Sequence, residues 1–390
     1  MPCSRPNDLS PRKGFSISLD RFSDITKSLR PGPGGGPTGD PALPNQPPND
    51  PSDAYRARDF ARRLKGLARP STGRSLFELG VTAVPLIGIW AAMALSLDYG
   101  YWIALLLSLP AAGLLVRLFM IQHDCGHHSF FKSRRANDLL GAVIGIFTLT
   151  PHGYWRHAHA IHHATSGDLS RRGIGDVVLL TVREYEALPR WRRLGYRLYR
   201  HPLVLFGIGP VYLFGIKFRL PLDMLQRRWR LLPGVLATNL AIGAVIVALG
   251  LVMGFAEFAM VQVPITMIAA SIGVWLFYVQ HQFEATVWDG PGEWDFHRAA
   301  VEGSSYYDLP RVLRWFTASI GVHHVHHLSS RIPSYRLEAC LKHIPELRRI
   351  NRITLLDSLR CVRLSLWDEE RRRLVSFRCL TRRRAADRQA

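Results

Sequence analysis

Cysteine is scarce in this chain of 390 residues and is never closely spaced. The five cysteines are Cys3, Cys125, Cys340, Cys361 and Cys379. Their odd number and wide spacing argue against a disulfide framework and against a zinc or iron–sulfur module built on thiolates. The chain also lacks a Gly-X-Y period, which excludes a collagen-like rod. Hydrophobic residues make up 47% of it, which is too much for wholesale disorder.

Acidic residues are outnumbered by basic ones. The chain has 30 Asp and Glu against 50 Lys and Arg, which gives a formal net charge of +20. Such a charge suits nucleic acid, an anionic membrane surface or an acidic protein partner. No helix-turn-helix, RNP-like aromatic box or zinc finger is visible, so we expect no nucleic-acid partner.

The two ends of the chain lack long apolar stretches. Residues 31–53 are rich in Pro, Gly and Asp, and the sequence predicts a disordered, basic tail over residues 1–66. No basic region followed by an apolar stretch and a small-residue cleavage site is present, so this tail does not resemble a secretory signal. Residues 361–390 are predicted to form a second basic tail.

Four stretches are long and apolar. They cover about 79–97, 101–122, 231–255 and 258–279, each near the ~20 residues that cross a bilayer core. Three of them carry no charge, and we expect Arg117, near the end of the second, to snorkel towards the membrane surface. Buried helices of soluble proteins usually keep a polar stripe, which these stretches lack. The sequence therefore predicts an all-α integral membrane protein with four transmembrane helices.

The four spans are arranged as two hairpins, with connections at 98–100 and 256–257. Neither connection contains Lys or Arg, whereas the segment 132–230 contains seventeen. The positive-inside rule then places both termini and the long central segment in the cytoplasm, at the inner membrane if the chain is bacterial. Two shorter apolar stretches, 139–150 and 203–221, are predicted to be interfacial or re-entrant helices.

Histidine is abundant where cysteine is not, and most of the sixteen histidines fall into three clusters. On a helix, positions i, i+3 and i+4 fall within an arc of roughly 100°, so each cluster presents one row of imidazoles. Eight candidate ligands follow this spacing: His123 and His127, then His159, His162 and His163, then His323, His326 and His327.

These eight side chains exceed what one ion needs, because a divalent metal takes about four to six ligands. The sequence thus predicts a dimetal site in a cytoplasmic helical cap beyond the spans. Imidazole ligands without thiolates do not identify the metal, which could be zinc, copper, iron or nickel. His281 stands alone at the end of the fourth span.

These clusters resemble the three histidine boxes of the membrane fatty acid desaturase family, which are of HxxxH, HxxHH and HxxHH type with pairs of spans between them. The resemblance covers about residues 75–360 and is closest to the omega-6 or carbon-12 acyl-lipid desaturases. It rests on HDCGHHSFF at 123–131, WRHAHAIHHATSGDLSRRGIGD at 155–176, YVQHQFEATVW at 278–288 and GVHHVHHLSSRIPSY at 321–335.

The resemblance implies a centre of two iron ions held by the three boxes and by His281. It implies that O2 and two electrons remove two hydrogens from a methylene pair of an acyl-lipid or acyl thioester, leaving a cis double bond, the second in a monounsaturated chain. The donor must be a separate ferredoxin-like or cytochrome b5-like protein with its reductase, since no HPGG haem segment, cysteine cluster or dinucleotide-type GxGxxG is present. Asp124, Asp168, Asp176 and Glu284 are candidate acceptors for the outer N–H of the ligand imidazoles.

Two other functions are compatible with the histidines. A membrane hydroxylase or ketolase uses similar boxes to insert oxygen, but the residues around the first and third boxes favour the desaturase. A metal transporter also combines spans with histidines. Its sites usually lie near the bilayer midplane on broken helices, whereas the spans predicted here are nearly free of ionisable groups.

Overall fold

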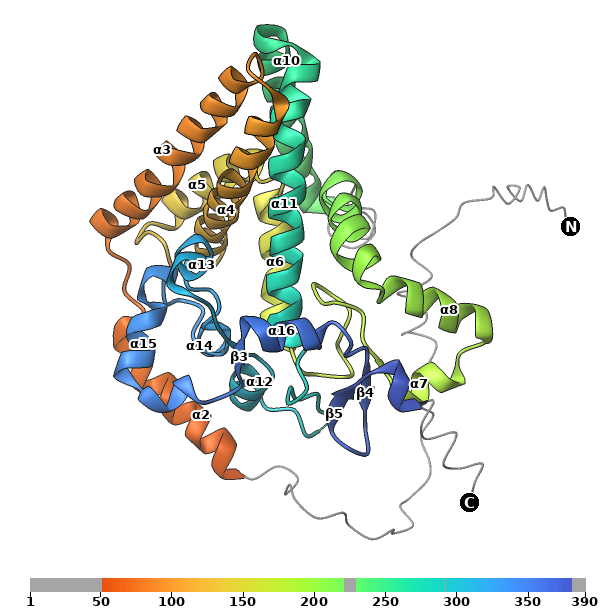
Figure 1. Cartoon of the computed structure of the whole chain (residues 1–390). Coiled ribbons are helices and arrows are strands. Elements are labelled where there is room, and N and C mark those ends of the chain that lie inside the picture. Colours follow the sequence, from red (N-terminus) through yellow and green to blue (C-terminus); the bar gives the residue numbers. More distant parts are fainter. Residues whose placement is uncertain (1–50, 221–228, 291, 381–390) are drawn as a thin grey trace, which may run out of the picture. The chain divides into compact units, whose positions relative to one another are not determined.

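The computed structural model describes residues 51–220, 229–290 and 292–380 (Figure 1). Most of the predicted N-terminal tail lies outside these residues, and its last part forms a helix. The α-helices are α2 (Pro51–Leu64), α3 (Thr72–Ser96), α4 (Tyr101–Gly126), α5 (Arg134–Phe147), α6 (His152–Thr165), α7 (Val182–Ala187), α8 (Arg190–Tyr199), α10 (Leu232–Met253), α11 (Phe255–His281), α12 (Phe296–Glu302), α13 (Arg311–Phe316), α14 (His323–Leu328), α15 (Leu337–His343) and α16 (Leu355–Cys361).

Short turns and strands complete the described chain. The 3-10 turns are η1 (Lys65–Leu67), η4 (Trp229–Leu231), η5 (Ser334–Arg336) and η6 (Pro345–Arg348), and two segments are π-helical, η2 (Val204–Ile208) and η3 (Val211–Lys217). The strands are β1 (Leu180–Thr181), β2 (Tyr306–Asp308), β3 (Arg352–Thr354), β4 (Leu366–Asp368) and β5 (Arg373–Val375).

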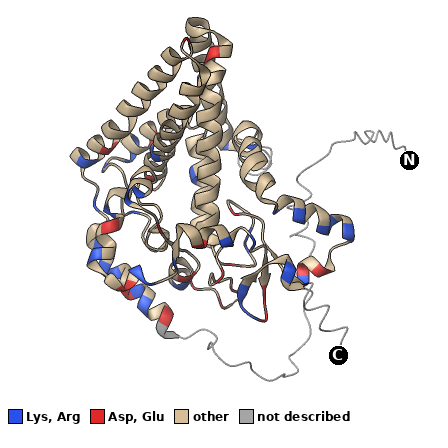
Figure 2. Cartoon of the chain, in the orientation of Figure 1, with Lys and Arg blue, Asp and Glu red and all other residues tan. Residues whose placement is uncertain are grey.

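Four helices are long and apolar enough to cross a membrane: α3, α4, α10 with the turn before it, and α11. They confirm the four predicted spans. The second and fourth run further than predicted, to Gly126 and His281, so that both helices carry histidines into the cap. Charged residues are sparse along these helices and more frequent in the rest of the described fold (Figure 2). Apolar side chains such as Val84 and Leu240 are exposed on their outer surfaces, as expected for contact with lipid. The chain is an integral membrane protein.

The second hairpin turns at a single residue. Gly254 ends α10 and begins α11, with φ 94° in the left-handed region that favours glycine. A Cβ at this position would also meet the carboxylate of Glu257. The connection therefore falls two residues before the predicted 256–257, because this backbone turn requires the glycine.

Arg117 does not snorkel, contrary to the prediction. Its side chain is buried and forms an ion pair with Glu78 of α3. Its Nε also donates to Thr82 Oγ1 at 3.0 Å, and its guanidinium lies 4.3 Å from the centre of the Trp315 ring in α13. A carboxylate on the neighbouring helix satisfies the charge inside the protein, so the side chain has no need to reach the membrane surface.

The cap contains two small sheets beside its helices. In one sheet β1 pairs in parallel with β4, and β4 pairs antiparallel with β5; in the other, β2 pairs in parallel with β3. Strands β4 and β5 lie in the segment predicted as a basic tail, and their side chains Leu366, Trp367 and Leu374 are buried. Residues 361–380 therefore belong to the folded cap, because apolar side chains are interspersed with the arginines there.

The two predicted interfacial stretches are helical and half-exposed. The first falls largely within α5, and the second forms the π-helical segments η2 and η3. Both present large apolar side chains on the outside, among them Leu139 and Leu203.

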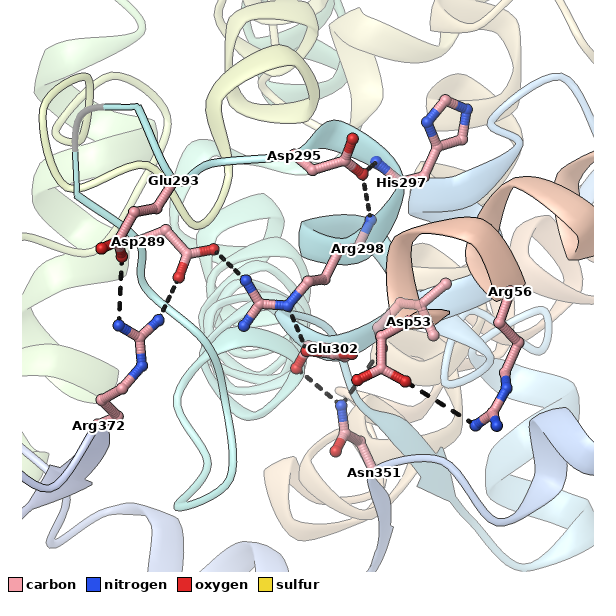
Figure 3. Close-up of polar contacts among 11 residues, drawn as sticks. Asp53, Arg56, Asp289, Glu293, Asp295, His297, Arg298, Glu302, Asn351 and Arg372 are labelled. Atoms are coloured by element: carbon pink, nitrogen blue, oxygen red, sulfur yellow. Dashed lines mark hydrogen bonds and ion pairs between the residues drawn. The ribbon is translucent and has the colours of Figure 1, made fainter. Parts of the chain in front are cut away.

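A buried ion-pair network holds the loop that follows α11. Asp289 is fully buried, and its oxygens accept from Arg298 Nη1 at 2.9 Å and Arg372 Nη2 at 2.5 Å (Figure 3). Arg372 also reaches Glu293 at 3.3 Å. The backbone of Asp289 pairs with that of Asp168, which follows the second histidine box. The network and this backbone pairing therefore join three parts of the cap that are far apart in the sequence: the segment after the second box, the loop between α11 and α12, and the segment around Arg372.

Replacing Asp289 by Asn removes the charge shared by two buried or half-buried guanidinium groups. Since breaking a buried ion pair leaves uncompensated charge, we expect a loss of stability on the order of 3 kcal/mol and a lower midpoint of thermal unfolding in detergent. The matched control is Glu284→Gln, because the Glu284 side chain is 67% exposed and pairs with the half-exposed Arg373, at 3.2 Å. Equal midpoints for the two variants would contradict the structural role given to Asp289.

Candidate metal site

Nine histidines converge where α4 and α11 enter the cap. His123 lies in the last turn of α4, His127 follows it directly, and His281 is the last residue of α11. The remaining six come from α6 and α14: His159, His162, His163, His323, His326 and His327. The structure thus brings together all nine side chains that the sequence singles out.

The nine rings form two groups. One group contains His123, His127, His159, His163 and His326, and the other contains His162, His281, His323 and His327; within each group one ligand atom of every residue lies within 4.8 Å of the others. The second and third boxes are each divided between the groups. The rings of His163 and His327, one from each group, stack at 4.1 Å with an angle of 16°, so the groups adjoin.

The nitrogens within a group face one another at a spacing that suits a cation. His281 Nδ1 lies 3.3 Å from the Gly303 carbonyl oxygen, which can only accept, so the proton of this neutral ring sits on Nδ1. Its bare Nε2 lies 3.1 Å from His162 Nε2 and 3.0 Å from His323 Nε2. Two nitrogens bound at right angles to one ion, each about 2.1 Å from it, stand about 3 Å apart.

The five-histidine group has the same spacing. Its Nε2 atoms lie 3.0 to 3.1 Å apart in the pairs His123–His159, His159–His163 and His163–His326. The donor set therefore fits two neighbouring metal ions with nitrogen ligands.

Four of the rings, those of His159, His163, His326 and His327, are held in their neutral form. Burial lowers the pKa of His159, His163, His326 and His327 well below the ordinary value, and the neighbouring rings lower it further because they disfavour a second positive charge. A neutral imidazole keeps the lone pair that binds a metal. The Nε2 atoms of His127 and His327 are buried without a hydrogen-bond partner, as expected of ligand atoms.

Two of the four predicted carboxylates lie beside the nine rings. Asp176 forms a hydrogen bond with His162 Nδ1, which directs His162 Nε2 into its group. Asp124 Oδ1 lies 3.5 Å from His123 Nδ1, and its Oδ2 accepts from the backbone N–H of Ser334 at 2.7 Å. Asp124 thus connects the first box to the segment after the third.

The other two predicted carboxylates, Asp168 and Glu284, bind groups other than the nine rings. Asp168 accepts hydrogen bonds from Ser170 and Arg171 in its own turn, and Glu284 is exposed beside Arg373. Neither is seen beside a ring of the two groups, so these two predictions of an outer-shell role are wrong.

Three histidines next to the boxes, His128, His157 and His324, lie outside both groups. His128 Nε2 lies 2.9 Å from Asp138 Oδ1, and His324 Nε2 donates to the Leu347 carbonyl at 2.9 Å. Burial also lowers the pKa of His324 to about 4. These contacts make His324 a structural residue of the cap.

Sequence reasoning missed three groups that touch the rings. The Gly303 carbonyl gives no signal in a sequence, because every residue has one. Trp155 stacks on His159 at 4.5 Å, and Phe277 packs against His281 at 5.3 Å. Both aromatic residues precede their histidine by four positions, and this i, i+4 spacing was the available signal.

Replacing Asp176 by Asn should weaken metal retention. The substitution keeps the size of the side chain but removes the charge that fixes the His162 ring, and such outer partners are worth about 10- to 100-fold in metal affinity. The matched control is Asp138→Asn, since Asp138 pairs with a histidine outside both groups. Metal per chain, measured by mass spectrometry after timed exposure to a chelator, should fall faster only for Asp176→Asn. Identical loss from both variants would contradict the role of Asp176.

Comparison with known proteins agrees with this site. A family model described as fatty acid desaturase matches residues 99–354, about two thirds of the chain. A fatty acid desaturase of Bacillus subtilis is 45% identical over 327 residues, which cover 84% of this chain and 92% of the relative.

More distant relatives carry more detailed names. An sn-1 oleoyl-lipid 12-desaturase of Synechocystis is 25% identical over 312 residues, 76% of this chain and 84% of the relative. An sn-1 acyl-lipid omega-3 desaturase (ferredoxin) of Nostoc is 28% identical over 290 residues, 69% of this chain and 74% of the relative. The resemblance predicted from the histidine boxes is thereby confirmed, and the chain belongs to the fatty acid desaturase family, whose members are oxidoreductases.

Proposed function

We propose that this chain is a diiron acyl-lipid desaturase that introduces a second cis double bond into a monounsaturated chain. The observation that carries the proposal is the convergence of nine imidazoles, in two adjoining groups, at the end of four membrane helices. The name of the Synechocystis relative, which specifies an oleoyl-lipid and carbon 12, supports the finer assignment.

The proposed reaction needs a redox metal. A mid-chain methylene is far too weak an acid for a protein base, so its C–H bonds must be cleaved by hydrogen-atom abstraction, which bound iron supplies when it reacts with O2. In the overall reaction, a –CH2–CH2– unit, O2, two electrons and two protons give a cis –CH=CH– unit and two waters. The electrons come from an external donor, ferredoxin-like or cytochrome b5-like, with its reductase; the name of the Nostoc relative specifies ferredoxin.

The protein's part is to hold the ligands and to exclude water. The Gly303 carbonyl and the Asp176 carboxylate fix the protons of His281 and His162 on Nδ1, so that each Nε2 faces its group. The four-histidine group is fully buried, whereas two members of the five-histidine group, His127 and His163, are partly exposed. The acyl chain therefore approaches the five-histidine group.

Expression in a bacterial host that makes monounsaturated but no dienoic acids tests the proposed reaction. With a ferredoxin and its reductase supplied, dienoic acids should appear at the expense of monoenes in gas chromatography with mass spectrometry, and His326→Ala should abolish them. The matched control is His324→Gln, which alters a histidine of the same helix outside both groups and should keep the product.

Iron analysis of the same proteins separates the alternatives. The purified chain should hold two irons, and His326→Ala and His323→Ala should each lose one, because each removes a ligand from a different group. Hydroxy acids in place of dienes would identify a hydroxylase instead. Bound metal without any O2 consumption in the presence of the donor would favour a transporter.

The proposal also places both termini and the metal site in the cytoplasm. Its support is the absence of Lys and Arg from both short connections between spans, against seventeen in segment 132–230. In a background with Cys3 and Cys379 replaced by Ser, a membrane-impermeant maleimide should label Tyr99→Cys in intact cells and Arg360→Cys only after permeabilisation. Both positions are exposed in the fold, so the reverse labelling pattern would overturn the orientation.

A further inference from the structure

Helix α8 is firmly attached to the end of a membrane span by its inner face. Tyr196 is buried, and its hydroxyl donates to the Ser365 carbonyl at 2.6 Å. Arg200, directly after the helix, is also buried and donates to Tyr278 Oη at 3.1 Å and Gln282 Oε1 at 3.0 Å. Tyr278 lies in the last turn of α11, and Gln282 follows it, so α8 cannot move independently of that span.

The outer face of α8 is an exposed apolar stripe. Trp191, Leu194 and Leu198 are 68%, 59% and 55% exposed. At 100° per residue they fall within roughly 60° of one another. Three large apolar side chains on one stripe, beside a buried inner face, are typical of a helix that lies in a membrane interface. Tryptophan in particular is enriched at that depth.

Positive charge flanks this stripe. Arg190 and Arg197 lie on one side of it and Arg192 on the other, with the Arg192 guanidinium 4.9 Å from the centre of the Trp191 ring. The sequence contains no Asp or Glu from Ala187 to Pro221. Figure 2 shows the resulting run of basic residues along α8.

The chain after α8 continues the apolar surface towards the next span. Leu203, Ile208, Ile216 and Leu220 are all exposed, and the third span begins at Trp229. An exposed apolar surface that runs from a basic helix towards a membrane span is covered most simply by the bilayer itself.

We propose that α8 is an in-plane membrane anchor, with Trp191, Leu194 and Leu198 immersed in the interface and Arg190 and Arg192 bound to anionic phospholipid headgroups. The surface fits this occupant better than an acidic electron donor, because the contacts of transient electron-transfer partners are small, whereas exposed apolar side chains continue from Trp191 on α8 to Leu220. The inference is independent of the reaction proposed above, since it requires only that the chain is a membrane protein.

A spin label attached at Leu194→Cys tests the immersion. The measurement uses the full-length protein with Cys3 and Cys379 replaced by Ser, reconstituted in phosphatidylglycerol nanodiscs. O2, which concentrates in the bilayer, should increase the spin relaxation rate of the label more than a water-soluble nickel chelate does. A label at Arg56→Cys, an exposed position on α2, is the control and should show the opposite order. Relaxation at position 194 equal to that at position 56 would overturn the proposal.

The headgroup contacts are tested by lipid selectivity. In nanodiscs of mixed phosphatidylglycerol and phosphatidylcholine, the enrichment of phosphatidylglycerol around the protein should fall at least about threefold in the double variant Arg190→Gln, Arg192→Gln, since each arginine near the surface attracts anionic lipid. The control double variant Arg56→Gln, Arg360→Gln removes the same charge from exposed positions elsewhere and should keep the wild-type enrichment.

Two results would exclude the anionic lipid as the ligand. One is unchanged enrichment in the α8 variant. The other is a label at position 194 that stays accessible to the nickel chelate in phosphatidylglycerol and becomes protected only when ferredoxin is added, which would assign this surface to the electron donor. Iron content and fatty acid products, measured on the same variants, report separately on the proposed reaction.

Discussion

The fold depends on one requirement, that nine imidazoles direct nitrogen atoms into one small volume. Bare nitrogens about 3 Å apart repel one another in the absence of a cation, and burial removes the water that would otherwise solvate them. The rings therefore need support from behind. Asp176, the Gly303 carbonyl and the stacked Trp155 provide such support at three of them.

Polar contacts do much of this positioning, and the reason is the surrounding lipid. Between membrane helices the hydrophobic effect gives little attraction, so packing and hydrogen bonds must hold the helices in register. The buried pair of Arg117 and Glu78 joins α4 to α3, and the same arginine lies on Trp315 in α13, shortly before the third box. In the cap, Asp289 joins Arg298 and Arg372 in the same way. The first of these ion pairs fixes α4, the helix that carries His123.

The sequence predicts the spans and the histidines that converge in the fold, because both depend on local patterns. About twenty apolar residues mark a span, and the i, i+3, i+4 spacing places His159, His162 and His163 along one helix. The same spacing does not reveal that these three rings divide between two groups, because that depends on where α14 and α11 approach α6. Asp176 was one of four candidate carboxylates, and only the fold separates it from Glu284.

Strands of two or three residues were beyond prediction. They leave no periodicity in a sequence, and β1 pairs with β4 across more than 180 residues. The error at the C-terminal segment has the same cause, since arginines dominate its composition while Leu366, Trp367 and Leu374 determine its fold.

The position of Arg372 has a consequence for how such genes are interpreted. A chain that stopped before residue 366 would keep every histidine and all four spans, yet it would lack β4, β5 and one of the two arginines that neutralise Asp289. A search for histidine boxes alone would count this chain as a complete enzyme. The residues after the last box are therefore needed for the folded cap of this chain, although none of those in β4 and β5 is a candidate metal ligand.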